Sequence, residues 1–97
     1  MSRIRTHPGE VLREEFMEPL NMSAGKIAKE IGVPRDRIEK LSREKKGMSA
    51  DTALRLSKLF GTTPDFWMNL QSSYELSVVK SQQDFDDIHT LECLQVH

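Results

Sequence analysis

Five charged side chains between residues 35 and 43 share the spacing of one helical face. They are Arg35, Asp36, Glu39, Lys40 and Arg43. An arginine can donate two hydrogen bonds to the N7 and O6 of a guanine, and a glutamate can accept one from the N4 of a cytosine. We therefore interpret Arg35, Asp36, Glu39 and Arg43 as candidate contacts to base edges, and Lys40 as a candidate contact to a phosphate.

A second set of side chains could contact phosphates around that face. The candidates are Ser23, Lys26, Lys45 and Lys46, together with Lys40. Such contacts position a protein on a duplex without reading its sequence. The acids Asp36 and Glu39 argue against this interpretation, because phosphates repel carboxylates and ordinary surface helices also mix both signs. An ordinary solvated helix face therefore stays open as the alternative.

The elements that would position these residues are two short helices joined by a tight turn, over about residues 23 to 44. Ser23 is a good N-cap, and Gly32 can take the left-handed conformation that ends a helix. Ala28 is small enough to let two helices cross closely. The positions that such a helix-turn-helix unit must bury are all aliphatic: Ile27, Ile31, Val33, Ile38 and Leu41. The second helix begins at Pro34 and would lie in the major groove of DNA.

Three further helices are predicted from capping signals and apolar spacing. The first covers residues 8 to 18, with Val11, Leu12, Phe16 and Leu20 on its apolar face and Pro19 at its end. The fourth follows Ser49, with Ala53, Leu54, Leu56, Leu59 and Phe60 on its apolar face before Gly61. The fifth opens at Thr63 and Pro64, with Phe66, Trp67 and Leu70 on one side. Phe60, Phe66 and Trp67 are expected in the core. Residues 82 to 94 could add a short sixth helix through Phe85, Ile88, Leu91 and Leu94, although nothing caps it.

Composition limits the chain to one small core with an uneven charge. The 97 residues are 37% hydrophobic and 30% charged, and the formal net charge is −1, which excludes a globally basic coat. Residues 35 to 46 nevertheless hold six cations and three acids, whereas residues 81 to 97 hold four acids and no Lys or Arg. We expect an all-α domain over residues 1 to 80 and an acidic tail over residues 81 to 97.

Other kinds of chemistry find little support in the sequence. His89 and Cys93 are four residues apart, but two ligands without a second pair do not make a zinc site. No nucleophile with a supporting base and no glycine-rich phosphate loop is present. We therefore expect no enzyme activity, no metal and no cofactor. The sequence shows neither an apolar run that could span a membrane nor a secretory signal, and the cytoplasm is the expected location.

Four stretches of the chain resemble the HigA/VapI-type antitoxins, a branch of the lambda-repressor-like (Xre) helix-turn-helix class. They are residues 7 to 12 (HPGEVL), 27 to 33, 49 to 58 and 61 to 71 (GTTPDFWMNLQ), and the resemblance covers about residues 7 to 75. It implies a five-helix bundle that dimerises. It also implies binding to a palindromic operator in the protein's own promoter, and neutralisation of a small RNA-cleaving toxin encoded beside it.

The departures from this family lie in the part that would face DNA. Pro34 stands where a serine N-cap is common, which forfeits about 1 kcal/mol of capping free energy. Ala24 replaces a glutamine that often contacts a phosphate. Small polar residues are usual at the positions of Asp36, Arg37 and Glu39, and a glycine is often found at that of Glu44. We expect a changed affinity or sequence preference, with the fold unaffected.

Two functions from different classes follow from these observations. The first is a homodimeric transcriptional regulator that represses its own operon and also neutralises a toxin. The second is a protein-binding module that masks a basic partner, with little sequence-specific DNA binding; the acidic tail favours this one. Tyr74, Leu76 and Val79 are apolar residues in excess of what the core needs, and they are the candidate dimer interface.

Overall fold

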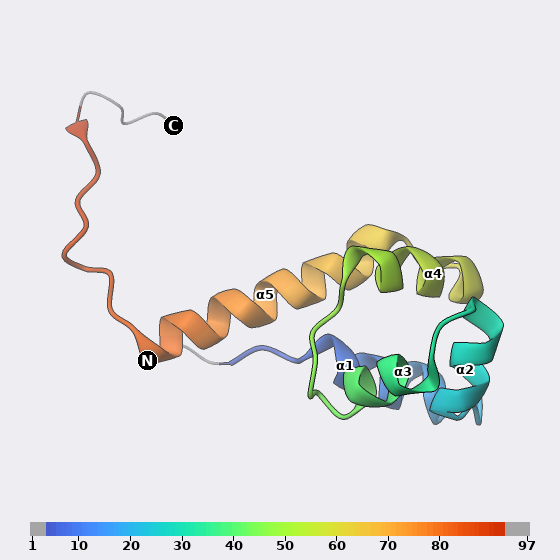
Figure 1. Ribbon diagram of the computed structural model, residues 1–97. Helices are drawn as coiled ribbons and strands as arrows, with labels where there is room; N and C mark the ends of the chain where they lie inside the picture. Colours follow the sequence, from blue (N-terminus) through green and yellow to red (C-terminus); the bar gives the residue numbers. More distant parts are fainter. Residues whose placement is uncertain (1–3, 93–97) are drawn as a thin grey trace.

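The computed structural model describes residues 4 to 92, and these fold into five helical segments without a strand. The first segment comprises α1 (Pro8–Val11) and a continuing π-helix, η1 (Leu12–Met17). The others are α2 (Ala24–Ile31), α3 (Arg35–Ser42), α4 (Ala50–Phe60) and α5 (Pro64–Gln82). Figure 1 shows the first four segments gathered at one end of α5, whose other half projects away from them. The predicted all-α, five-helix fold is confirmed.

The caps expected from the sequence define the helix ends. Ser23, Ser49 and Thr63 are the N-cap residues of α2, α4 and α5, and each side-chain oxygen accepts a hydrogen bond from the backbone N–H three residues on. Gly32 and Gly61 follow α2 and α4 in the left-handed conformation, with φ of 71° and 74°. Local sequence therefore sets these boundaries.

The first helix differs from the single α-helix predicted over residues 8 to 18. After one α-helical turn the chain widens into the π-helical turns of η1. Because a π-helix takes more residues per turn, residues after it no longer follow α-helical spacing. Phe16 still packs on the rings of Phe60 and Trp67, at centroid distances of 4.6 and 5.2 Å. Leu20, expected on the same face, is 55% exposed.

The core lies between η1, α2, α3, α4 and the first half of α5. Its fully or almost fully buried apolar side chains include Leu12, Ile27, Ile38, Leu41, Leu56 and Trp67. The prediction of a core position is wrong for two residues. Leu54 is 54% exposed, because it follows the buried Ala53 and points about 100° away from the face that Ala53 and Leu56 share. Phe66 is 39% exposed and only packs edge-on against Trp67.

The start of α1 is tied to both α3 and α5. His7 is buried, its Nδ1 accepts a hydrogen bond of 2.8 Å from the Gly9 N–H, and its ring meets that of Tyr74 edge-on. Burial lowers the pKa of His7, and this favours the neutral imidazole that the accepting role requires. At Gly9 the backbone approaches α3 so closely that a Cβ would lie 1.8 Å from the carbonyl oxygen of Leu41.

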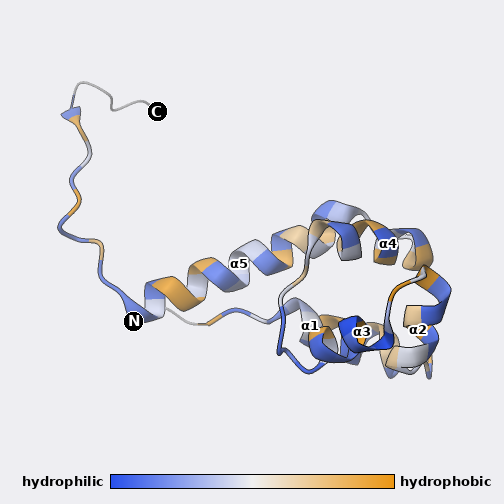
Figure 2. Ribbon diagram, in the orientation of Figure 1, coloured by the Kyte–Doolittle hydropathy of each residue, from blue (hydrophilic) through white to orange (hydrophobic). Residues whose placement is uncertain are grey.

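The outer half of α5 carries apolar side chains that the other described residues leave uncovered. Leu76 is 57% and Val79 is 41% exposed, and apolar segments are visible on this half of the helix in Figure 2. Residues 4 to 7 run beside it, where the Arg5 N–H donates to the Ser77 Oγ at 2.9 Å. No helix among the described residues is both long and apolar enough to cross a membrane.

The short sixth helix considered from the sequence is not formed over residues 83 to 92. Phe85, Ile88 and Leu91 are exposed, and Leu94 lies outside the described residues, as does Cys93. The Asp84 carboxylate accepts from the Asp86 N–H and forms a local turn. A short segment with no surface to pack against gains too little from helix formation, which explains the difference.

Replacing Gly9→Ala should lower the free energy of unfolding by at least about 2 kcal/mol, because backbone rather than a flexible side chain blocks the new methyl group. The matched control is Gly25→Ala in α2, where the nearest atom is the Arg35 Cδ at 3.5 Å. That change should be neutral or stabilising by up to about 1 kcal/mol. Urea unfolding followed by circular dichroism compares the two, and equal stabilities would contradict the close approach.

Candidate nucleic-acid interface

The pair α2 and α3 forms the helix-turn-helix unit expected from the sequence. The turn passes through Gly32, and the Val33 N–H returns to the Ala28 carbonyl at 3.0 Å. Ile27 and Ile38 are fully buried between the helices, and Ala28 is 2% exposed at the crossing. Pro34 is the N-cap of α3 and provides no side-chain hydrogen bond, as expected.

Three of the predicted base-reading residues, Arg35, Asp36 and Glu39, lie on the solvent side of α3 in two ion pairs, one of which includes Lys40. The Arg35 Nε donates to the Glu39 Oε1 at 2.6 Å, and the Lys40 Nζ lies 3.0 Å from the Asp36 Oδ2. The two residues of each pair are one helical turn apart and lie at the surface, so each pair stabilises the helix by only about 0.3 to 0.5 kcal/mol. Breaking these ion pairs to contact DNA therefore costs little free energy. Their role in base reading stays a prediction.

The other cations surround this face. Arg43, Lys45 and Lys46 are exposed and form no ion pair within the described part of the chain. Lys26 pairs with Glu30 at 3.1 Å. The Ser23 Oγ accepts the N-cap hydrogen bond from the Lys26 N–H at 3.1 Å, which leaves its hydroxyl proton free to meet a phosphate. Contact of these residues with phosphates stays a prediction.

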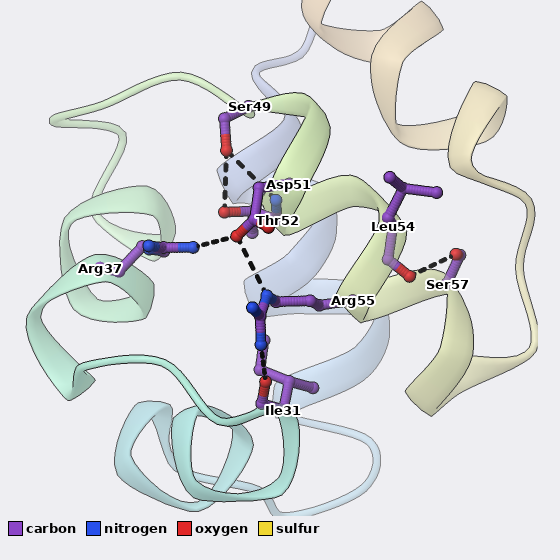
Figure 3. Close-up of polar contacts among 8 residues, drawn as sticks. All are labelled: Ile31, Arg37, Ser49, Asp51, Thr52, Leu54, Arg55 and Ser57. Carbon is purple, nitrogen blue, oxygen red and sulfur yellow. Dashed lines mark hydrogen bonds and ion pairs between the residues drawn. The ribbon is translucent and has the colours of Figure 1, made fainter.

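Arg37 points away from the predicted DNA-facing side and reaches α4. Its Nη1 lies 2.5 Å from the Asp51 Oδ2, and the Arg55 Nε donates to the same oxygen at 3.0 Å. The Arg55 Nη1 in turn donates to the carbonyl of Ile31, at the end of α2, at 2.7 Å. Figure 3 shows this chain of contacts across α3, α4 and α2. The hydrogen bond from Arg37, followed by the charge and hydrogen bond of Arg55, lowers the pKa of Asp51.

A second arginine holds the other end of α3. The Nη1 of Arg13, in η1, donates to the Ser42 carbonyl, and its Nη2 lies 3.3 Å from the Glu44 Oε2. Glu44 has a φ of 62°, so it occupies the left-handed position at the end of α3. This cap is completed by two backbone hydrogen bonds, which the N–H groups of Glu44 and Lys45 donate to the carbonyls of Leu41 and Lys40, respectively. The glycine expected from the family resemblance would suit the position better.

The loop that carries Lys45 and Lys46 is fastened to α5 by Gln71. The buried Gln71 Oε1 accepts from the Met48 N–H at 2.5 Å, and its Nε2 donates to Glu75 at 2.8 Å. A Cβ at Gly47 would lie 2.7 Å from the Gln71 Oε1. The described residues contain no cluster of three or more His, Cys, Asp or Glu side chains that could hold a metal ion.

Sequence reasoning found the outward face of α3 but missed the side chains that hold the helix. Arg13, Arg37, Asp51, Arg55 and Gln71 received no positioning role. The only local signal is the one-turn spacing of Asp51 and Arg55, which is compatible with an ordinary surface pair.

Comparisons with known proteins identify relatives of the same fold. A family model described as helix-turn-helix matches residues 14 to 67. Virulence-associated protein I of Dichelobacter nodosus is 42% identical over 85 residues, which are 88% of this chain and 77% of that protein. Pseudomonas aeruginosa antitoxin HigA, solved with the higBA promoter, has a TM-score of 0.81 and 38% identity, covering 93% of this chain and 98% of that one. Antitoxin GraA in complex with its operator has a TM-score of 0.84 and 40% identity, covering 94% and 95%. The resemblance to HigA/VapI-type antitoxins is thereby confirmed.

The left-handed conformation of Glu44 leads to a stability prediction. The free energy of unfolding of Glu44→Gly should be about 1 kcal/mol higher than that of Glu44→Gln. Both changes remove the carboxylate that pairs with Arg13, but only glycine relieves the strain of the left-handed backbone. Urea unfolding of the two variants measures this difference. A glutamine variant as stable as the glycine variant would show that the backbone is unstrained at this position.

Proposed function

The chain belongs to the helix-turn-helix family that includes the HigA and VapI antitoxins, and we propose that it binds an operator upstream of its own gene and represses its own operon. Relatives are named as transcriptional regulators and antitoxins, and this chain is a regulator of that kind, not an enzyme. The observation that carries the proposal is the polar face of α3, which is held outward by a buried opposite face.

In the proposed complex α3 lies in the major groove. Arg35 and Arg43 donate to guanines, and Glu39 accepts from a cytosine N4 after its pair with Arg35 opens. Lys40, Lys45 and Lys46 meet phosphates beside the groove, and Ser23 and Lys26 meet them near the start of α2. The relatives HigA and GraA have been solved with a promoter and with an operator, respectively, which supports DNA as the partner.

The proposed regulator is a homodimer that uses the projecting half of α5. Leu76 and Val79 are exposed there, and an open groove of about 660 Å³ lies beside Leu76, between α5 and residues 4 to 6. Tyr74 is partly covered by His7 and contributes less. A symmetric dimer places its two copies of α3 roughly 34 Å apart, which calls for an inverted repeat in the DNA.

We further propose that a cognate toxin is the protein partner and that both act in the cytoplasm. Relatives named as antitoxins support the first part. The tail adds a chemical reason, because residues 83 to 92 expose acids beside Phe85, Ile88 and Leu91, and this combination suits a basic protein surface. Masking a basic partner without sequence-specific DNA binding is the competing function.

Operator binding is tested by fluorescence anisotropy with a duplex from directly upstream of the start codon and a shuffled duplex, at two salt concentrations. The wild type should prefer the upstream duplex by a factor of about 10³. Arg35→Ala should reduce this preference by about 10-fold or more, because a base contact is lost. The control Lys46→Ala should weaken binding to both duplexes equally. It should also reduce the slope of log affinity against log salt concentration by about one.

Equal and weak binding to both duplexes would contradict the repressor and favour the masking module. A preference that survives Arg35→Ala, with the upstream duplex still bound, would instead show that other residues read the bases.

Dimerisation is tested by light scattering on size-exclusion fractions of Leu76→Asp/Val79→Asp. We expect a monomer, because two carboxylates cannot be buried in an apolar interface without a partner. Leu54→Asp is the matched control, since Leu54 is 54% exposed on α4 and Leu76 is 57% exposed on α5. A double variant that remains dimeric would remove α5 as the interface.

A further inference from the structure

Few apolar contacts fix how α3 is turned about its own axis. Ile38 and Leu41 are its only apolar side chains, and both are buried on the same side. A helix of eight residues that is held along one apolar line can rotate about its own axis. Such a rotation would move Arg35 and Arg43 across the major groove in the proposed DNA complex. A contact off that line is needed to prevent it.

Arg37 supplies the contact on the α4 side. It lies one residue before Ile38, so it points about 100° away from the buried line. Its guanidinium meets the Asp51 carboxylate at 2.5 Å. The same carboxylate oxygen receives the Arg55 Nε at 3.0 Å, so one oxygen joins two helices.

Arg55 carries the connection into the turn of the helix-turn-helix unit. Its Nη1 donates to the Ile31 carbonyl at 2.7 Å and lies 3.6 Å from where a Cβ would stand at Gly32. The carbonyl belongs to the last turn of α2, where backbone acceptors lack partners within the helix. The contacts therefore run from α3 through Asp51 and Arg55 to the end of α2.

We propose that Asp51 is a positioning residue for operator recognition: by holding Arg37 and Arg55 together, it keeps α3 in the rotational setting in which its outward face meets the bases. The proposal rests on the proposed function. Asp51 itself lies on α4 and touches no DNA in this scheme. It acts through Arg37, whose charge is thereby kept away from the phosphates.

Positioning and stability can be separated at this site. The side chains of Arg37, Asp51 and Arg55 are 40%, 56% and 43% exposed. Exposed ion pairs of this kind contribute little to the free energy of unfolding. A change at Asp51 should therefore affect DNA recognition more than folding.

Asp65 offers a matched control. Asp51 and Asp65 each stand two residues after the N-cap of their helix, following Ser49 and Thr63, and both are exposed. Asp65 forms no ion pair within the part of the chain that the structure describes. Asp51→Asn and Asp65→Asn thus make the same change in net charge and in the charge at a helix start.

The experiment compares wild type, Asp51→Asn, Asp51→Glu and Asp65→Asn at a temperature at which all are folded. The first readout is the ratio of affinities for the upstream and the shuffled duplex. The second is hydrogen exchange of the α3 amides without DNA, followed by mass spectrometry. We expect Asp51→Asn to lower the ratio by about five-fold and to speed α3 exchange. Asp65→Asn should leave both unchanged, and Asp51→Glu should recover most of the ratio.

Each result decides the matter. An unchanged affinity ratio in Asp51→Asn would overturn the proposal, whether or not exchange of the α3 amides changes. A lower unfolding temperature in Asp51→Asn with an unchanged affinity ratio would also overturn it, since that is a structural effect alone. A wild type without preference for the upstream duplex would refute the proposed function. In that case, α3 amides that exchange faster in Asp51→Asn than in the wild type would still support the anchoring of α3 by Asp51.

Discussion

Burial of Ile38 and Leu41 is the constraint on which the rest of the structure depends. These two side chains decide which face of α3 turns inward; Arg35, Asp36 and Arg43 are exposed on the other side, and Glu39 and Lys40 are partly exposed there. The packing partners are specific. α2 crosses at Ala28, and α1 approaches so closely at Gly9 that no side chain fits. Two apolar contacts place the helix but leave its rotation weakly fixed, so polar contacts from other elements complete the task.

Three arginines provide those contacts, and none of them belongs to the predicted reading face. Arg13 caps the C-terminal end of α3, while Arg37 and Arg55 meet at Asp51. Arginine suits this work because its planar, permanently charged group donates in several directions at once. Among the cations of α3, Arg37 thus pairs with α4, whereas Arg35 and Lys40 lie on the side predicted to face DNA. The latter are held by neighbouring acids in exposed pairs, which DNA phosphates can replace at little cost.

Sequence reasoning predicted the elements whose causes are local. The caps at Ser23, Ser49 and Thr63 and the glycine turns at Gly32 and Gly61 lie where residue type alone places them. It failed where distant residues decide. The π-helical turns of η1 and the partners of Arg37 depend on which neighbours the fold supplies. The absent sixth helix follows the same rule, because its apolar spacing has no surface to pack against.

We propose that α3 reads operator DNA while its inner and lateral contacts hold it still. A crystal structure of the chain with the duplex from upstream of its start codon tests this most directly. We expect α3 in the major groove with Arg35 and Arg43 at base edges, and Arg37 still bound to Asp51. A structure with α3 away from the groove, or with Arg37 released from Asp51 to a phosphate, would contradict it.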